Sequence, residues 1–113
     1  MSRSTLRRDS QFRTVYSTGE RIAGEKVVIY YLRRDEKRIL PGFVASRKIG
    51  KSVIRNKAKR IMREVFRRLA PRFKVDGLWI VFVAAFNPKE HSFREVLADV
   101  EALLVKAGLI EQV

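Results

Sequence analysis

The alternation of apolar and polar positions predicts three strands and three helices along this chain of 113 residues. Segments rich in β-branched and aromatic residues favour strands, and they occupy residues 26–33, 40–46 and 78–85. Apolar residues at helical spacing occupy residues 9–18, a segment from Ser52 to Pro71, and one from Ser92 to Gly108. The order α-β-β-α-β-α indicates an α+β fold with one domain over residues 1–113, and it leaves open whether the basic N-terminal residues 1–8 are ordered.

The first predicted helix, residues 9–18, begins and ends at residues that suit helix termini. Asp9 or Ser10 is expected to cap its first turn, and Gly19 is expected to take the left-handed conformation after its last turn. Spacings of three and four residues place Phe12, Val15 and Tyr16 on one face. From spacing alone, this stripe is typical of a helix face that packs into the core.

The other two predicted helices carry terminal signals as well. Ser52 is expected to cap the second helix, and Pro71 to end it because proline lacks the backbone N–H that a continuing helix requires. Ser92 and Glu95 have the spacing of a capping box, and Gly108 suits the C-terminal end of the last helix.

The strands differ in their expected burial. In the first, alternation places Val27, Ile29 and Tyr31 on one face of the sheet and Val28, Tyr30 and Leu32 on the other. The second contains Pro41, which strands tolerate near their start or at the edge of a sheet. The third, LWIVFVAA, is a continuous apolar run that is typical of a strand buried on both faces.

Charge indicates the class of partner. The chain has 25 lysine and arginine residues against 12 acids, a formal net charge of +13. Residues 47–68, RKIGKSVIRNKAKRIMREVFRR, contain ten of these cations and a single acid, Glu64. Because 46% of the chain is hydrophobic, the imbalance indicates a folded protein with a polyanionic partner rather than a disordered chain.

A helical wheel divides this segment into an apolar stripe and a basic face. The stripe consists of Ile54, Ala58, Ile61, Met62, Val65 and Leu69. Opposite it lie Arg55, Lys59, Arg63 and Arg67, with Asn56 and Arg60 beside them, whereas Lys57, Glu64 and Arg68 lie on the other flank. Like charges four residues apart repel each other, so an unbroken row of them is not typical of a solvated helix. Since arginine pairs well with phosphate oxygens, the row favours nucleic acid over an anionic membrane.

The sequence predicts no catalytic residue and no metal site in the protein. GKS, residues 50–52, matches the end of a phosphate-binding loop, but Ala45 stands where that loop requires glycine. The chain has no cysteine, one histidine (His91) and scattered acids without the spacing of a triad, a zinc site or an acid–base pair. No apolar run has the length of a signal peptide or a membrane span, which indicates a cytoplasmic protein with no membrane partner.

One long motif resembles a known family. Residues 42–66, GFVASRKIGKSVIRNKAKRIMREVF, are similar to the signature of the bacterial ribonuclease P protein subunit, in which a strand and a basic turn lead into a helix that opens with an Arg-Asn-basic box. The resemblance extends to the central strand, the last helix and an N-terminal pattern formed by Phe12, Val15, Tyr16 and Gly19. It therefore covers nearly the whole chain.

The resemblance implies a compact α/β sandwich with an unusual left-handed β-α-β crossover, similar to the second domain of a small-subunit ribosomal protein. It also implies the accessory subunit of an RNA enzyme that removes the 5′ leader of precursor tRNA and leaves the mature 5′ end. Catalysis and its Mg²⁺ ions would belong to the RNA, with no cofactor bound by the protein alone. The partners would be ribonuclease P RNA and precursor tRNA, with the protein as a monomer within the ribonucleoprotein. The alternative is a general structural RNA-binding protein of ribosome assembly.

The resemblance further assigns two sets of binding residues. Contacts to the catalytic RNA are expected from Arg47, Lys48, Lys51, Arg55, Asn56, Lys57, Lys59, Arg60, Arg63 and Arg67. Contacts to the precursor leader are expected from Phe12, Tyr16, Val28, Tyr30, Val44, Ser46 and Lys48, so that the aromatic stripe becomes a partly exposed RNA surface.

Two positions depart from the family pattern. Lys57 stands where arginine is commoner, which keeps the attraction to phosphate but loses the bidentate geometry, and the wheel places it away from the basic row. The third strand ends in Ala84, Ala85, Phe86 and Asn87 without the usual basic residue, so no RNA contact is assigned there.

Overall fold

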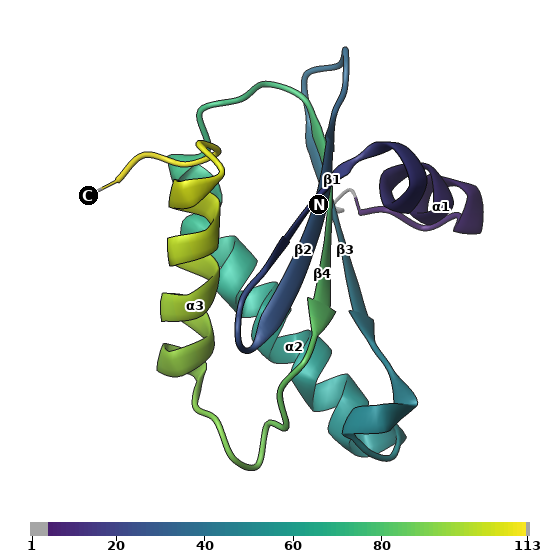
Figure 1. Cartoon of the computed structure of the whole chain (residues 1–113), viewed down its shortest axis with the longest axis vertical. Coiled ribbons are helices and arrows are strands. Elements are labelled where there is room, and N and C mark those ends of the chain that lie inside the picture. The colour runs from purple at the N-terminus through teal and green to yellow at the C-terminus, as the bar shows by residue number, and fades with distance from the viewer. Residues whose placement is uncertain (1–4, 113) are drawn as a thin grey trace.

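The computed structural model describes residues 5–112, which form a four-stranded sheet with helices on both faces (Figure 1). The helices are α1 (Asp9–Thr18), α2 (Ser52–Leu69) and α3 (Phe93–Lys106), and the strands are β1 (Glu20–Ala23), β2 (Val27–Arg33), β3 (Ile39–Ala45) and β4 (Leu78–Ala84). Short 3₁₀ turns, Arg47–Ile49 and Ala70–Arg72, precede and follow α2. The α+β class and the six predicted elements are confirmed, with strand ends that differ by one residue.

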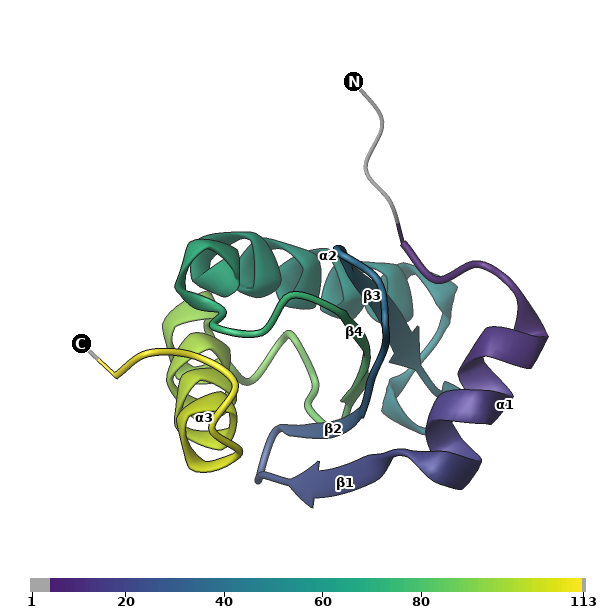
Figure 2. The same ribbon diagram turned by 90° about the horizontal axis from the view of Figure 1, so that it is seen from above.

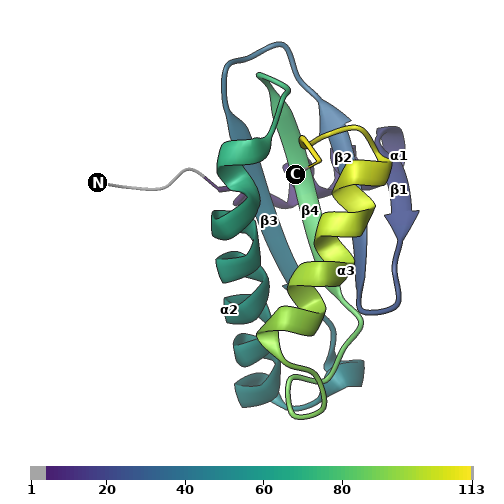
Figure 3. The ribbon, with the colours of Figure 1, turned by 90° about the vertical axis from the view of Figure 1, so that its left-hand side faces the viewer.

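The strands lie in the order β1-β2-β4-β3. The β1–β2 and β2–β4 pairs are antiparallel, and β3–β4 is parallel with α2 as the connection. Seen from the side of α2 and α3, β3 lies to the left of β4, both strands run downward, and α2 lies in front of them (Figure 3). This is the left-handed crossover that the family resemblance implies. Because β3 is an edge strand, Pro41 lies where a missing backbone donor is tolerated.

Strand β1 was not predicted. Its four residues, ERIA, are mostly exposed and give no clear alternation of apolar and polar positions. The strand forms because it pairs with β2, with Ile22 opposite Ile29. The predicted conformation of Gly19 is also wrong, since its φ of −84° is extended. Glycine is required there by close packing, because a Cβ atom would lie 2.5 Å from the carbonyl oxygens of both Val15 and Tyr31.

The two faces of the sheet hold separate apolar clusters, as the alternation in β2 predicts. Val27 and Ile29 point to the face covered by α2 and α3, where the larger cluster includes Phe82 and the predicted stripe of α2 apart from Ile54. Helix α1 lies on the other face of the sheet (Figure 2). Tyr30 and Leu32 point to this face, where they belong to a smaller cluster with Val15. The predicted burial of β4 on both faces is confirmed for Ile80, Val81 and Phe82.

Two predicted helix caps are wrong and one is confirmed. Arg8, not Asp9 or Ser10, precedes α1, and Gln11 Oε1 accepts hydrogen bonds from the backbone N–H groups of Arg7 and Arg8 at 2.9 and 3.0 Å. Ser52 is the first residue of α2 rather than its cap, a position that Lys51 occupies without a side-chain hydrogen bond. The capping box of α3 is present, with reciprocal hydrogen bonds between Ser92 and Glu95.

The C-terminal ends of α2 and α3 lie where the sequence predicts them, and part of the N-terminal segment is packed against β3. The α-helical part of α2 ends at Leu69, two residues before Pro71. Gly108 has φ +76°, which suits the end of α3. In the N-terminal segment, Leu6 is buried and its N–H donates to the carbonyl oxygen of Pro41 at 2.9 Å, whereas Arg3 lies outside the described residues.

Candidate nucleic acid interface

The sheet face next to α1 carries a row of valines across three strands. The strand register places Val28 of β2 opposite Val83 of β4, and Val83 beside Val44 of β3. All three side chains are partly exposed. Val83 was missed from the sequence, although its alternation with the buried Val81 places it on this face. The row forms an apolar floor, which we call the valine floor.

Three aromatic side chains border this floor. The rings of Tyr16 and Tyr30 meet edge to face with centroids 4.8 Å apart, and Phe12 lies 6.5 Å from Tyr16. The next sheet row consists of Tyr30, Val81 and Gly42, and a Cβ atom on Gly42 would lie 2.6 Å from the Phe12 ring. The helix therefore packs directly onto the β3 backbone. We call Phe12, Tyr16 and Tyr30 the aromatic wall.

Tyr16 is the most accessible part of the aromatic wall, with 41% of its surface exposed. Partial burial, and to a lesser degree the proximity of Tyr30, raise the pKa of its phenol above the ordinary value. The phenol is therefore neutral at physiological pH and can donate a hydrogen bond. A partly exposed neutral aromatic ring suits stacking on a nucleobase better than contact with a phosphate.

Arg21 is a cation at this surface that the sequence did not reveal. It lies on β1 opposite Tyr30, and its Nε donates to the Tyr30 hydroxyl at 3.3 Å. Its guanidinium carbon also lies 5.9 Å from the centroid of the Tyr30 ring. Only the unpredicted pairing of β1 with β2 brings it there. The exposed Arg21 thus supplies a positive charge beside the aromatic wall.

A basic turn joins this surface to α2. Ser46 follows β3 directly, and its Oγ accepts a hydrogen bond from the backbone N–H of Lys48 at 3.3 Å. Gly50 has φ +143°, a value that side chains rarely permit, which explains the glycine of the GKS triplet. Arg47, Lys48 and Lys51 are all exposed. The turn places these cations between the end of the valine floor and the start of α2.

The basic face of α2 winds around the helix rather than following one line. Arg55 and Lys59 are half-buried, whereas Asn56, Arg60, Arg63 and Arg67 are exposed. The predicted position of Arg55 opposite the apolar stripe is therefore wrong. Residues four apart are rotated by about 40° around the helix axis. A row of side chains that points to solvent at Arg63 therefore lies on the flank of the helix at Arg55. Arg55 Nε is buried and has no hydrogen-bond partner among the described residues.

The structure separates Lys57 from this basic face, as the wheel predicts. Lys57 is exposed on the other flank, the side on which Arg68 lies over the ring of Phe93 in α3, 5.4 Å from its centroid. On the basic face, Arg67 forms an ion pair with Glu64 at 3.2 Å. Ala85 is exposed and Phe86 is buried in the core, so the end of β4 presents a small apolar residue rather than a cation.

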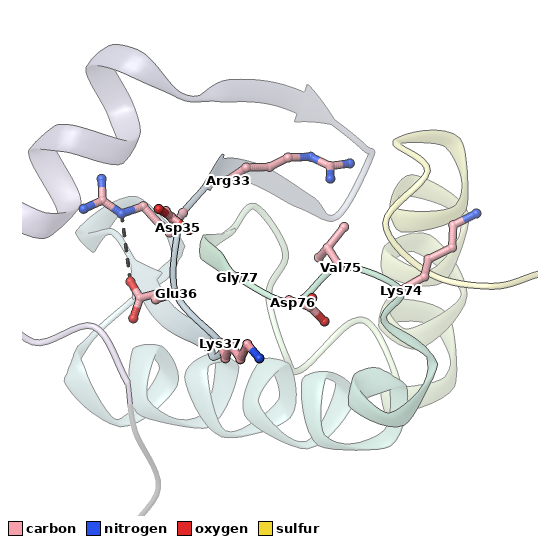
Figure 4. Close-up of a pocket in the computed structure, with 9 residues that line it drawn as sticks. Arg33, Asp35, Glu36, Lys37, Lys74, Val75, Asp76 and Gly77 are labelled. Atoms are coloured by element: carbon pink, nitrogen blue, oxygen red, sulfur yellow. Dashed lines mark ion pairs between the residues drawn. The ribbon is translucent and has the colours of Figure 1, made fainter.

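The other end of the sheet has a hollow of a different kind. It measures about 660 Å³ and lies between the β2–β3 loop and the segment before β4 (Figure 4). Glu36 forms ion pairs there with Arg34 and Arg38 at 3.9 and 3.0 Å, and it accepts a hydrogen bond from Trp79 Nε1. The hydrogen bond from Arg38 is the main reason that the pKa of Glu36 is lowered. Acids and cations alternate around this hollow, so it does not form a basic surface.

Two further properties bear on the kind of site. Among residues 5–112, no three His, Cys, Asp or Glu side chains lie close enough together to hold a metal ion. None of the helices formed by these residues is both long and apolar enough to cross a membrane.

Comparisons with known proteins identify the family to which this chain is similar. The family model for ribonuclease P matches residues 1–108. The ribonuclease P protein component of Caldanaerobacter subterraneus subsp. tengcongensis is 36% identical over 107 residues, 95% of this chain and 91% of the relative. That of Symbiobacterium thermophilum is 38% identical over 104 residues, 89% of this chain and 88% of the relative.

Solved structures show the same fold. The RNase P protein from Thermotoga maritima has a TM-score of 0.81 and 29% identity, covering 97% of this chain and 100% of that one. The RNase P protein of Staphylococcus aureus has a TM-score of 0.83 with the same coverage, and at 23% identity it supports the fold alone.

Proposed function

Because this chain belongs to the ribonuclease P protein family, whose members are the protein subunit of an endoribonuclease, we propose that it binds ribonuclease P RNA and the 5′ leader of precursor tRNA. The observation that carries this proposal is the coexistence of two unlike surfaces. One is the apolar and aromatic surface beside α1, and the other is the basic face of α2. The basic turn after β3 connects them.

The leader lies across the valine floor. Its bases stack on the aromatic wall, because a π-face accepts any base and leaders differ in sequence. Lys48 and Ser46 hold the backbone at the end of β3, and Arg21 attracts a phosphate beside Tyr30. The protein thus contributes position and charge rather than bond-breaking chemistry.

The catalytic RNA lies against α2 and the basic turn. Arg60, Arg63 and Arg67 point outward and contact phosphates, and Arg55 supplies further charge at the flank. Lys57 contacts either a different RNA element or none. Cleavage belongs to the RNA, which binds the magnesium ions, and the protein takes part as a monomer.

The test is reconstitution with the RNA that co-purifies with the chain. A single large RNA is expected, and the protein is expected to increase its removal of leaders from precursor tRNA at low magnesium concentration. Cleavage by the protein alone, or no effect on the activity of that RNA, would contradict the proposal. Binding to ribosomal RNA without dependence on leader length would instead indicate a ribosome-assembly protein.

A further inference from the structure

A groove on the other face of the sheet is not used by the leader surface. It lies between the open edge of β3 and the C-terminal half of α2, which run side by side in Figure 3. Ile39, Pro41 and Phe43 line it from β3, and Arg63, Phe66 and Arg67 line it from α2. Its volume is about 380 Å³, within the range of pockets that hold small organic groups. We call it the aromatic–arginine groove.

The groove and the valine floor are separated by strand β3. Alternation along this strand places Gly42 and Val44 on the α1 side, whereas Pro41 and Phe43 point to the α2 side. Thr5 of the N-terminal segment also lines the groove, next to the hydrogen bond that links Leu6 to Pro41. A ligand in this groove therefore leaves the leader surface free.

The floor of the groove is aromatic and only partly covered. Phe43 and Phe66 meet edge to face with ring centroids 6.2 Å apart, and both rings are partly exposed. Phe82 supports them from below, with centroids 5.5 and 5.9 Å from Phe43 and Phe66. Since the supporting ring is buried, the two exposed rings are held in place before any ligand arrives. Because the two rings are inclined at 70°, a planar heterocycle can stack on one of them while its edge meets the other, on a surface that is already preorganised.

The rim of the groove is cationic. Arg63 lies over the Phe43 ring, with its guanidinium carbon 5.4 Å from the ring centroid, and among residues 5–112 it forms no ion pair. Arg67 lies one turn further along and is partly neutralised by Glu64. An aromatic floor with arginines at its rim complements a nucleotide, because the base meets the rings and the phosphate meets the guanidinium groups.

We propose that the aromatic–arginine groove binds one unpaired nucleotide of the ribonuclease P RNA, with the base against Phe43 and Phe66 and its phosphate on Arg63. Charge complementarity favours RNA over a protein segment, because the groove opens onto the basic face of α2 in a chain of net charge +13. This inference rests on the proposed function, since it assumes that α2 faces that RNA. It adds a single-nucleotide contact to what would otherwise be binding to phosphates alone.

The experiment measures the dissociation constant of the full chain for the co-purifying RNA, transcribed in vitro, with no precursor tRNA present. Phe66→Leu is expected to weaken binding by about fivefold or more, the lower range for one stacked base. Arg63→Gln is expected to weaken it as well, but Arg63 also lies on the basic face of α2, so Phe66→Leu decides the groove proposal. Arg68→Gln is the matched control for Arg63, because it lies over Phe93 at the same 5.4 Å but outside the groove. Phe73→Leu is the control for Phe66, since its ring lies 5.8 Å away and does not line the groove. Both controls are expected to stay within about twofold of the parent.

A further variant distinguishes a blocked groove from a loss of folding. Ala70→Leu fills the groove without removing a ring, and it should weaken RNA binding like Phe66→Leu while its thermal unfolding stays close to the parent's. Ultraviolet irradiation of the complex, followed by mass spectrometry of peptides, is expected to place a nucleotide adduct on Phe43 or Phe66. Adducts confined to residues 47–51 would overturn the proposal.

The remaining outcomes separate this inference from the proposed function. If Phe66→Leu and Ala70→Leu bind like the Phe73→Leu control while Arg60→Gln or Arg63→Gln still weakens binding, the groove proposal fails and the proposed function stands. If neither arginine variant has an effect either, both fail. If light scattering shows a dimer that Phe66→Leu dissociates, the groove is an interface between copies of the chain and the proposal is overturned.

Discussion

The two faces of the sheet differ in how completely helices cover them. On one face, α2 and α3 bury a continuous cluster that includes Phe82, Met62 and Leu104. On the other, the single short helix α1 packs its own Val15 against Val81 but leaves the valine floor partly exposed. The same alternating strands supply both faces, so the difference comes from the number and length of the helices above them.

The two faces therefore have different roles, one in folding stability and the other in ligand binding. The closed face supplies most of the buried apolar area, which is the main source of folding stability. The open face keeps apolar surface available to a ligand, at the expense of some stability. Helix α2 serves both purposes, because its apolar stripe closes one face while its opposite side presents cations.

The largest expected effect is on stability at the closed face. Phe82→Ala removes a ring that is 1% exposed and packs against Phe43 and Phe66. We expect the free energy of unfolding, measured by urea denaturation, to fall by about 3–5 kcal/mol. Tyr16→Ala on the open face should reduce it by only about 0.5–1.5 kcal/mol, the range for one aromatic pair. Equal losses would mean that the two faces contribute alike.

The open face should instead respond in leader binding. Tyr16→Ala is expected to weaken binding to a precursor tRNA by about 5- to 150-fold, corresponding to the loss of one stacked base. Binding to the same tRNA without a leader should not change. Tyr16→Phe keeps the ring and serves as the matched control, with affinity close to the parent. An unchanged preference for leader-bearing precursors would remove the aromatic wall from the leader site.

The basic face of α2 should respond in the salt dependence of RNA binding. Arg55→Ala combined with Arg60→Ala is expected to weaken binding to ribonuclease P RNA. The slope of log K against log salt should become shallower by about 0.7–0.9 for each phosphate that the variant no longer neutralises. Arg94→Ala, an exposed arginine on α3, should leave the slope unaltered. A shared decrease would indicate that net charge, not the α2 face, determines binding.

The smallest effect concerns the start of α3 on the closed face. The hydrogen bond from the Ser92 backbone N–H, 2.8 Å from the Glu95 carboxylate, is the main cause of the lowered pKa of Glu95. The ionised Glu95 carboxylate therefore stabilises the fold above its unfolded-state pKa of about 4.3, and this stabilisation is lost as the pH falls through its lower pKa in the folded state. Thermal unfolding of Glu95→Gln should depend less on pH in this acidic range than that of the parent. Identical pH profiles would contradict the cap.

The spacing of apolar residues was sufficient to predict the helices and strands that bury a full apolar face. The α2 stripe and the alternation in β2 predicted the larger cluster, and the Ser92–Glu95 spacing predicted the cap of α3. Strand β1 was missed because its stability comes from pairing with β2, not from its own four residues. Arg21 was missed with it, since its place beside Tyr30 exists only in the paired sheet.

For the binding surfaces, the sequence predicted which residues share a helix face but not how exposed each of them is. The charge row on α2 follows from sequence spacing, but the row rotates by about 40° every four residues, so Arg55 at its start lies on the partly buried flank of the helix. The aromatic stripe of α1 was visible as a pattern, and spacing alone could not distinguish a core face from a binding surface. The distinction depends on the width of sheet that α1 leaves uncovered.

Two glycines, which have no Cβ atom, determine the width of the sheet surface that α1 leaves uncovered. Gly19 lets the end of α1 approach the backbone of Tyr31, and Gly42 lets the Phe12 ring rest on β3. A Cβ atom at either position would meet atoms at 2.5 or 2.6 Å, so the helix would have to lift or shift sideways. The height of the aromatic wall above the valine floor is thus set by two residues that contribute no side chain to it. Substitution of either glycine by alanine would alter the shape of the binding surface while leaving every side chain that lines it unchanged.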